Sequence, residues 1–118
     1  MILVDTSVWV DHLRATNNRL ANLLDDGEAA CHPFVLGELL LGNLRANSQV
    51  PELLASLPQL VVAEHQEVVA FAEHHRLAGT GIGWVDAHLL ASAALCSARL
   101  WTRDQRLGDV AARLGLSS

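Results

Sequence analysis

Short apolar runs alternate along this chain with longer segments of helical spacing, and this alternation constrains the fold more than any other feature. The first run, residues 1–4, ends in Asp5, a pattern typical of a strand buried on both faces of a parallel sheet. Three further runs predict strands at 28–31, 59–63 and 99–102. Because helical sequence separates the strands, we expect a parallel α/β sandwich, with no obvious fifth strand after Leu116.

Amphipathic or apolar segments fill the intervals between these runs. We expect helices at about 8–13, 20–24, 33–44, 51–58, 67–77, 84–97 and 110–114. Thr6 and Ser7 can cap the first helix and Asp109 the last, because short polar side chains satisfy the free N–H groups of a first helical turn. The alanine-rich helix at 84–97 is apolar nearly all round, so we expect it in the centre of the fold.

The size and composition of the chain favour one small domain, residues 1–118. With 118 residues, 51% of them hydrophobic, the chain can close a single core. No uncharged stretch reaches the roughly 18 apolar residues of a membrane span, and no basic segment precedes the apolar start, so we expect a cytoplasmic protein without a membrane partner. Cys31 and Cys96 lie in apolar contexts typical of reduced core thiols.

The charge balance excludes several classes of function. A formal net charge of −5 argues against binding nucleic acid through phosphate contacts alone, because that mode needs a basic excess. The basic residues are all arginine, which excludes P-loop phosphate binding, Schiff-base chemistry and other mechanisms that need a lysine. A polyanionic substrate would therefore need help from metal ions.

Two carboxylates follow predicted strands. Asp5 ends the first strand, and Asp104 follows the strand at 99–102 by two residues. Ligands bind at the carboxyl ends of strands in open parallel sheets, so both are candidates for a functional site. Taken singly, each also has a simpler explanation as a helix cap or turn residue.

Two further acids stand alone in apolar helices. Glu38 is the only charged residue between Glu28 and Arg45, and its neighbours at helical spacing are nonpolar. A carboxylate there loses hydration and needs a partner, unless its side chain reaches solvent on an outer face. Asp86, in the first turn of the helix at 84–97, is likewise the only charged residue between Arg76 and Arg99. The alternative explanation for Asp86 is that an acid in the first turn of a helix interacts favourably with the helix dipole.

Four acids that meet at one edge would repel one another unless a cation lies among them. Their hard oxygen ligands suit Mg²⁺ or Mn²⁺ rather than zinc, and such a site can cleave phosphodiester bonds. The chain outside these acids is nearly neutral, so it can accept a nucleic-acid strand through nearby arginines, although solvated salt bridges are the simpler role for any one of them. The arginines in question are Arg14, Arg45, Arg103 and Arg106.

The acids occur in a specific order and context: Asp5-Thr6-Ser7-Val8-Trp9, Glu38 in an apolar helix, Trp84-Val85-Asp86-Ala87, and Thr102-Arg103-Asp104. In these features the chain resembles a PIN domain over nearly its whole length, specifically the VapC-type ribonuclease toxins of VapBC toxin–antitoxin modules. The resemblance implies a three-layer α/β/α sandwich with a central parallel sheet of four to five strands. The chain differs from the family in that it stops soon after Leu116. We therefore expect the last short strand of the family to be curtailed or absent here.

The resemblance also implies an activity and its residues. Asp5, Glu38, Asp86 and Asp104 would bind Mg²⁺ or Mn²⁺ as the catalytic acids, with Ser7 and Thr102 as supporting polar residues. The expected reaction is endonucleolytic cleavage of RNA, of the tRNA or rRNA class, leaving a 5′-phosphate and a 3′-hydroxyl. Asp104 is the position most open to variation in the family, and we expect Asp109 to cap a helix rather than to bind metal.

Partners and surfaces follow from the same comparison and from composition. The resemblance implies a cognate VapB-type antitoxin that blocks the site. Because so small and apolar a chain cannot bury all its hydrophobic side chains, we expect a homodimer, forming a heterotetramer or larger assembly with the antitoxin. We place the antitoxin groove on the helices within 8–24 and on the helix that Pro33 opens.

Several weaker signals remain open. The loop Gly79-Thr80-Gly81-Ile82-Gly83 follows a helix and lacks nucleotide-binding spacing, so we expect a mobile loop that borders the site. Trp9, Trp84 and Trp101 either stack on bases or, more commonly, anchor the core or an interface. The six histidines lack the paired spacing of a zinc site.

Two other functions compete with the ribonuclease. A PIN-like protein-binding module would use the acids to stabilise its fold or to receive a basic peptide, so neutralising them would abolish no activity. The second competing function is a metal-dependent DNA nuclease, because nothing in the sequence reads the 2′-hydroxyl directly. The cleaved RNA, its sequence and the number of metal ions are not determined by the residues.

Overall fold

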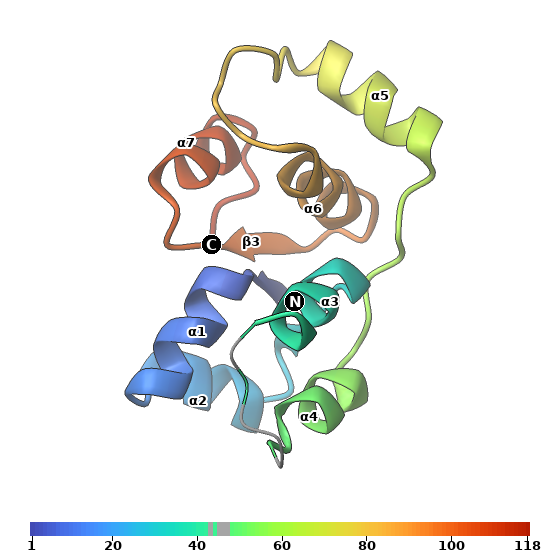
Figure 1. The fold of residues 1–118 in the computed structure, drawn as a ribbon. Helices are drawn as coiled ribbons and strands as arrows, with labels where there is room; N and C mark the ends of the chain where they lie inside the picture. The colour runs from blue at the N-terminus through green and yellow to red at the C-terminus, as the bar shows by residue number, and fades with distance from the viewer. Residues whose placement is uncertain (43, 45–47) are drawn as a thin grey trace.

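A computed structural model describes residues 1–42, 44 and 48–118 of the chain (Figure 1). Three parallel strands form the sheet of this described part: β1 (Ile2–Val4), β2 (Ala29–Ala30) and β3 (Arg99–Trp101). Their order is β2-β1-β3, with Ile2 paired to both Ala29 and Arg99. The first strand in sequence is therefore central, and its carboxyl end delivers Asp5 to the middle of the sheet edge.

The described residues contain seven helices, which cover the sheet. They are α1 (Thr6–Arg14), α2 (Asn18–Asp25), α3 (Pro33–Leu40), α4 (Val50–Ser56), α5 (His65–His74), α6 (Trp84–Leu95) and α7 (Gln105–Arg113). In Figure 1, α6 and α7 lie on one side of the sheet and α1 and α2 on the other, with α5 packed outside α6. This arrangement confirms the expected α/β/α layering. None of these helices combines the length and the apolarity needed to cross a bilayer.

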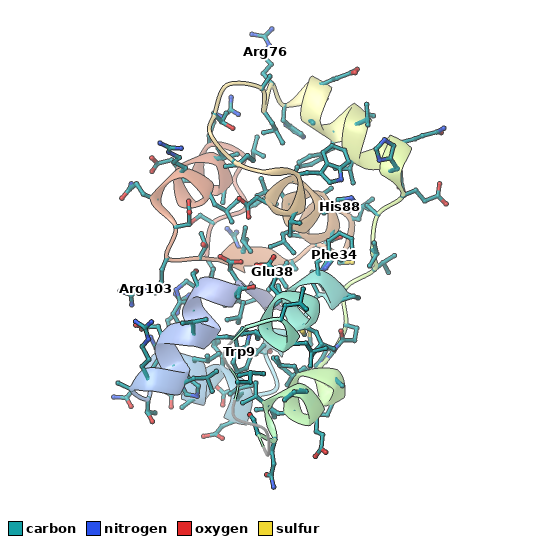
Figure 2. All side chains as sticks on the ribbon, in the orientation of Figure 1. Trp9, Phe34, Glu38, Arg76, His88 and Arg103 are labelled. Carbon is teal, nitrogen blue, oxygen red and sulfur yellow. The ribbon has the colours of Figure 1, made fainter. Side chains whose placement is uncertain are left out.

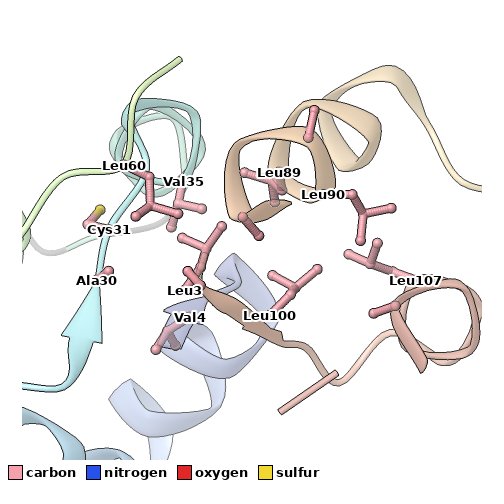
Figure 3. Packing of buried hydrophobic residues seen from close by; sticks show 14 of the residues in the cluster. Leu3, Val4, Ala30, Cys31, Val35, Leu60, Leu89, Leu90, Leu100 and Leu107 are labelled. Atoms are coloured by element: carbon pink, nitrogen blue, oxygen red, sulfur yellow. The ribbon is translucent and has the colours of Figure 1, made fainter. Parts of the chain in front are cut away.

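The core fills both sides of the sheet, and one part of it lies between the sheet and α6. Figure 3 shows Leu3 and Leu100 from the strands opposite Leu89 and Leu90 of α6, while Leu107 of α7 closes one side. All five side chains are buried. The prediction that the alanine-rich helix occupies the centre is confirmed, because every residue of α6 from Ala87 to Ala93 is buried.

The sheet is smaller than the four to five strands expected. Residues 59–63 do not form a strand; only Gln59 makes a parallel bridge, to Cys31, and Val61 is 65% exposed. Pairing therefore stops after one residue, because the segment leaves the sheet edge toward α5. At the chain end a single bridge joins Leu100 to Ser117, so the final strand is curtailed as expected.

Helix boundaries depart from the expectations at three places. Helix α3 ends at Leu40 rather than near residue 44, and α5 runs over His65–His74 rather than 67–77. The last helix starts at Gln105, because the Asp104 side chain accepts a hydrogen bond from the Leu107 N–H and caps it. Asp109 is therefore inside α7 and does not cap it; its carboxylate accepts a bond from Gln105 at 3.0 Å.

Both cysteines are free thiols, as expected. Cys31 is buried and Cys96 is half-buried. Burial raises the pKa of the Cys31 thiol above its usual value. The chain therefore relies on packing rather than on a disulfide to hold its ends together.

Candidate acidic site

The four predicted acids come from four different elements. Asp5 directly follows β1, and Asp104 follows β3 and caps α7. Asp86 lies in the first turn of α6, and Glu38 lies in the second half of α3. Each of Glu38 and Asp86 interacts electrostatically with Asp5, and Asp86 also interacts with Asp104. The structure thus brings the four acids into one region at the carboxyl edge of the sheet.

Asp5 is the anchored member of this group. Its carboxylate is buried, with only 7% of the residue exposed, and both Ser7 and Thr102 donate hydrogen bonds to Oδ2 at 2.9 Å and 2.7 Å. The backbone N–H of Asp5 donates to Trp101 O at 2.9 Å. Hydrogen bonds to a charged oxygen are stronger than neutral ones, so the two hydroxyls fix this carboxylate in place.

The same hydroxyls tie distant parts of the chain together. Ser7 Oγ accepts a bond from the Arg103 N–H at 3.0 Å, and Thr102 Oγ1 accepts one from the Asp104 N–H at 3.0 Å. Thr6 and Ser7 were expected to cap α1, but the N-cap position is Asp5, whose side chain makes no capping bond; the Ser7 hydroxyl donates to the Asp5 carboxylate instead. Ser7 and Thr102 thus lie at the positions expected of supporting residues, and they connect the start of α1 to the turn before α7.

Glu38 lies in a less favourable environment. Partial burial raises the pKa of its carboxyl, and the negative charge of Asp5 raises it further. The Thr6 hydroxyl nearby offsets part of this rise, and Asp86 adds to it. Much of the Glu38 side chain nevertheless reaches solvent, as the outer-face alternative anticipated. Figure 2 shows Glu38 on the side of α3 that faces the start of α1.

Asp86 is also destabilised in its charged form. Burial raises its pKa, a hydrogen bond from the Gly83 N–H lowers it in part, and the charges of Asp5 and Asp104 raise it further. That hydrogen bond is long, 3.4 Å from Gly83 N to Asp86 Oδ2. The first turn of α6 thus holds a carboxylate that the surrounding acids push toward neutrality.

This donor set fits a hard divalent cation. The converging groups are carboxylate oxygens, the ligands that Mg²⁺ and Mn²⁺ prefer, and burial together with the neighbouring acids raises the pKa of Glu38 and of Asp86. Within the described residues, no three acidic, histidine or cysteine side chains are close enough together to form a ready-made coordination group. Rotation of side chains such as the exposed Glu38 would be needed to complete one.

Two of the arginines considered for a nucleic-acid strand lie beside this site. Arg103 pairs with Asp11 at 3.0 Å on the exposed surface of α1, in the salt-bridge role considered for it. Arg106 packs over Gly81, where an added Cβ would approach Arg106 Cδ to 2.8 Å. Arg14 ends α1 and is exposed, and Arg45 lies outside the described residues.

The glycine loop borders the site as expected. Gly81 meets Arg106, and Gly83 donates to Asp86. Thr6 was considered only as a helix cap, yet its buried hydroxyl makes no hydrogen bond among the described residues and lies close enough to Glu38 to lower the pKa of that carboxyl. The clue available in the sequence was its position next to Asp5, which places it at the carboxyl end of the central strand.

Comparison with known proteins identifies relatives over nearly the full length of the chain. The PIN domain family model matches residues 2–113. The chain is 52% identical to the Ribonuclease VapC32 of Mycobacterium tuberculosis, in each of two strains, over 118 residues that cover 99% of this chain and 95% of the relative.

Solved structures share the fold at lower identity. FitAcB from Neisseria gonorrhoeae superposes with a TM-score of 0.61 at 24% identity, covering 95% of this chain and 94% of that one. FitAB bound to an IR36 DNA fragment gives a TM-score of 0.61 at 22% identity, with 95% and 91% covered. At these identities the likeness concerns the arrangement of the elements alone.

Proposed function

The chain belongs to the PIN domain family, and from this premise we propose that it is an endoribonuclease toxin of the VapC type, which cuts RNA with the help of a divalent metal ion. Its near full-length identity of 52% to a named ribonuclease supports the activity. The structural observation that carries the proposal is the approach of Glu38 and Asp86 to Asp5, and of Asp104 to Asp86, at one sheet edge, where burial and these neighbouring acids raise the pKa of Glu38 and Asp86.

We propose that these four acids hold Mg²⁺ or Mn²⁺. Bound there, the cation would supply Lewis-acid activation of water and of the phosphodiester. The residues of the chain do the rest: Ser7 and Thr102 orient the Asp5 carboxylate, and the backbone of Gly83 orients Asp86. Asp104 has one oxygen committed to capping α7, since Oδ1 accepts from Leu107 at 2.9 Å.

The activity is tested by incubating purified protein with end-labelled structured RNAs and with DNA of the same sequence. We expect cleavage of RNA with Mg²⁺ or Mn²⁺ and none with EDTA. Asp5→Asn should lower the rate by more than about a hundredfold, because loss of a residue that only supports a metal ligand already costs 10- to 100-fold. Asp25→Asn, which changes an exposed acid at the end of α2, is the matched control.

The outcomes separate the three candidate functions. Cleavage of DNA but not RNA would favour the DNA nuclease. If wild type and Asp5→Asn are equally inert or equally active, the protein-binding module becomes the better account. No observation in the structure favours either alternative over the ribonuclease.

VapC toxins act with an antitoxin partner, and we propose where a VapB-type antitoxin binds. Helix α3 packs against α1 and α4, and these three helices expose large apolar side chains. The exposed side chains are Val10, Leu13, Leu40, Leu41 and Leu53, with Leu41 exposed to 92%. Exposed apolar patches of this kind mark protein interfaces. Leu13→Ser combined with Leu41→Ser should weaken inhibition by the antitoxin while leaving RNA cleavage unchanged.

We further propose that the single domain acts in the cytoplasm as a homodimer, joined to the antitoxin in a heterotetramer or larger assembly. The two free thiols suit a reducing compartment. Light scattering of the free protein and of its antitoxin complex measures both assembly states directly, and a monodisperse monomer would contradict the dimer.

A further inference from the structure

A cavity of about 470 Å³ opens on the α5 side of the acidic region. It lies between the end of α5, the glycine loop and the first turn of α6, and its walls are mainly apolar, formed by Leu77, Ala78, Ile82, Trp84 and Ala87. Its volume falls in the range of small-molecule sites. We propose that this cavity binds one unstacked base of the RNA substrate beside the bond that is cut, with Trp84 as the stacking surface. The proposal rests on the ribonuclease function.

The cavity shares a wall with the acidic site. Gly83 lines the cavity, and its N–H donates to Asp86 Oδ2. Trp84 and Asp86 are two residues apart in the first turn of α6 and therefore point to different sides of it, with Gly83 between the cavity and the Asp86 carboxylate. We place the base held against Trp84 on a nucleotide that runs past the Gly83 end of α6, next to the phosphodiester that the acids are proposed to engage.

Trp84 is exposed but held in a fixed orientation. It is 44% exposed, which is unusual for so large an aromatic residue in a small core-forming helix. The His88 ring meets it edge-on, 5.3 Å between centroids at 86°, and the His65 ring is tilted by 46° to it with 5.2 Å between centroids. His88 in turn packs against Phe34 at 4.8 Å, as Figure 2 shows for the two labelled residues. A ring that is already ordered loses little entropy when a base stacks on it.

The polar groups around the cavity suit a nucleotide. Glu73 lines it and supplies a carboxylate, which accepts hydrogen bonds from the amino groups of bases. On the other side of the glycine loop, Arg106 packs over Gly81 and follows Asp104 by two residues. An arginine at this point provides positive charge for the phosphate backbone between the cavity and the acids.

The position of the cavity favours RNA over the antitoxin as its occupant. The apolar residues proposed for the antitoxin lie on α1, α3 and α4, whereas the cavity lies between α5 and α6 at the opposite end of the molecule (Figure 1). Single-stranded RNA is commonly recognised by stacking unstacked bases on aromatic side chains. Trp84 meets that requirement beside the proposed catalytic acids.

The test uses two variants of the cavity and one control in the full-length protein. Trp84→Ala removes the stacking surface, and Ala78→Phe fills the cavity from an exposed position without disturbing the core. Val61→Ala removes an exposed apolar side chain that does not line the cavity. Each protein is incubated with a random-sequence RNA in Mg²⁺, and cleavage positions are mapped by sequencing, with melting temperature as the check on folding.

We expect wild type and Val61→Ala to show the same rate and a base preference at one position next to the cut. Both cavity variants should lose that preference and cleave about tenfold more slowly, the effect of losing one base-stacking contact. The proposal is overturned if either folded cavity variant keeps both rate and preference. It is also overturned if these variants keep the wild-type rate and base preference but are no longer inhibited by the antitoxin. If wild type cleaves no RNA, the proposed function itself has failed.

Discussion

Asp5 and Glu38 both belong to the proposed acidic site, but their surroundings in the fold differ. Asp5 is buried and receives two hydrogen bonds from hydroxyls, whereas Glu38 reaches solvent and its charged form is opposed by burial and by Asp5 itself. The hydroxyls make Asp5 part of the structure. Glu38 adds repulsion at neutral pH that a bound cation would relieve. The difference indicates that one half of the site supports folding and the other half opposes it.

The largest predicted effect is a loss of folding stability at low pH. It comes from a buried histidine of the core and not from the acids of the site. His32 is fully buried and neutral: Nδ1 accepts from the Phe34 N–H at 2.9 Å, and Nε2 therefore donates to Ser92 Oγ at 3.0 Å. Burial, together with nearby His88, lowers the pKa of His32 to about 4. The stability that its neutral form provides is complete above pH 6.5 and is lost as the pH falls toward 4, by up to about 3 kcal/mol.

Urea unfolding between pH 7.5 and pH 4 measures this loss. In His32→Asn the side-chain oxygen can still cap α3 but cannot be protonated, so its stability should fall less over the same range. The raised pKa values of Glu38 and Asp86 act in the opposite direction, because their protonation at low pH relieves repulsion. Equal pH dependence in wild type and His32→Asn would contradict the assignment to His32.

A second prediction concerns the support of Asp5. Thr102→Val keeps the shape of the side chain but removes the donor to Asp5 and the acceptor for the Asp104 N–H. We expect a loss of about 1–2 kcal/mol in the free energy of unfolding and a 10- to 100-fold lower rate of RNA cleavage. Thr80→Val is the control, because Thr80 bonds only a loop carbonyl, that of Leu77. If Thr102→Val cleaves RNA at the wild-type rate, Asp5 does not depend on this hydroxyl.

The sequence predicted the strand that carries Asp5 and the helices that carry Glu38 and Asp86, because each rests on a strong local pattern. It gave helix capping as one explanation of Asp104, but it assigned the cap of the last helix to Asp109, whereas Asp104 caps α7. Both Asp104 and Asp109 have residue types that favour a cap, and only the position at which β3 ends selects between them. Likewise, residues 59–63 have the composition of a strand, but tertiary pairing stops at Gln59.

The local sequence pattern could not predict the contacts between distant segments either. Ser7 and Thr102 are 95 residues apart, and their hydroxyls lie 3.3 Å from each other only because β1 and β3 are neighbours. The cavity beside Trp84 depends in the same way on the packing of α5 against α6. Sequence reasoning placed the acids, and the fold determined what supports each of them.

The smallest predicted effect lies away from both halves of the site. Ser97, between α6 and β3, has a φ of 53°, which favours glycine. Ser97→Gly should therefore stabilise the protein by about 0.5–1 kcal/mol and leave RNA cleavage unchanged. Thermal unfolding and a cleavage assay check both parts. A loss of stability would mean that the Ser97 side chain contributes more than its backbone strain costs.

The contrast between Asp5 and Glu38 is tested most directly by the stability of Asp5→Ala and Glu38→Ala without metal. Urea unfolding in EDTA at pH 7 should show Asp5→Ala less stable than wild type by about 1–3 kcal/mol, because the hydroxyls of Ser7 and Thr102 lose their buried acceptor. Glu38→Ala should be as stable as wild type or slightly more so, because it removes repulsion. Equal destabilisation by both substitutions would contradict the division of the site into a supporting half and an opposing half.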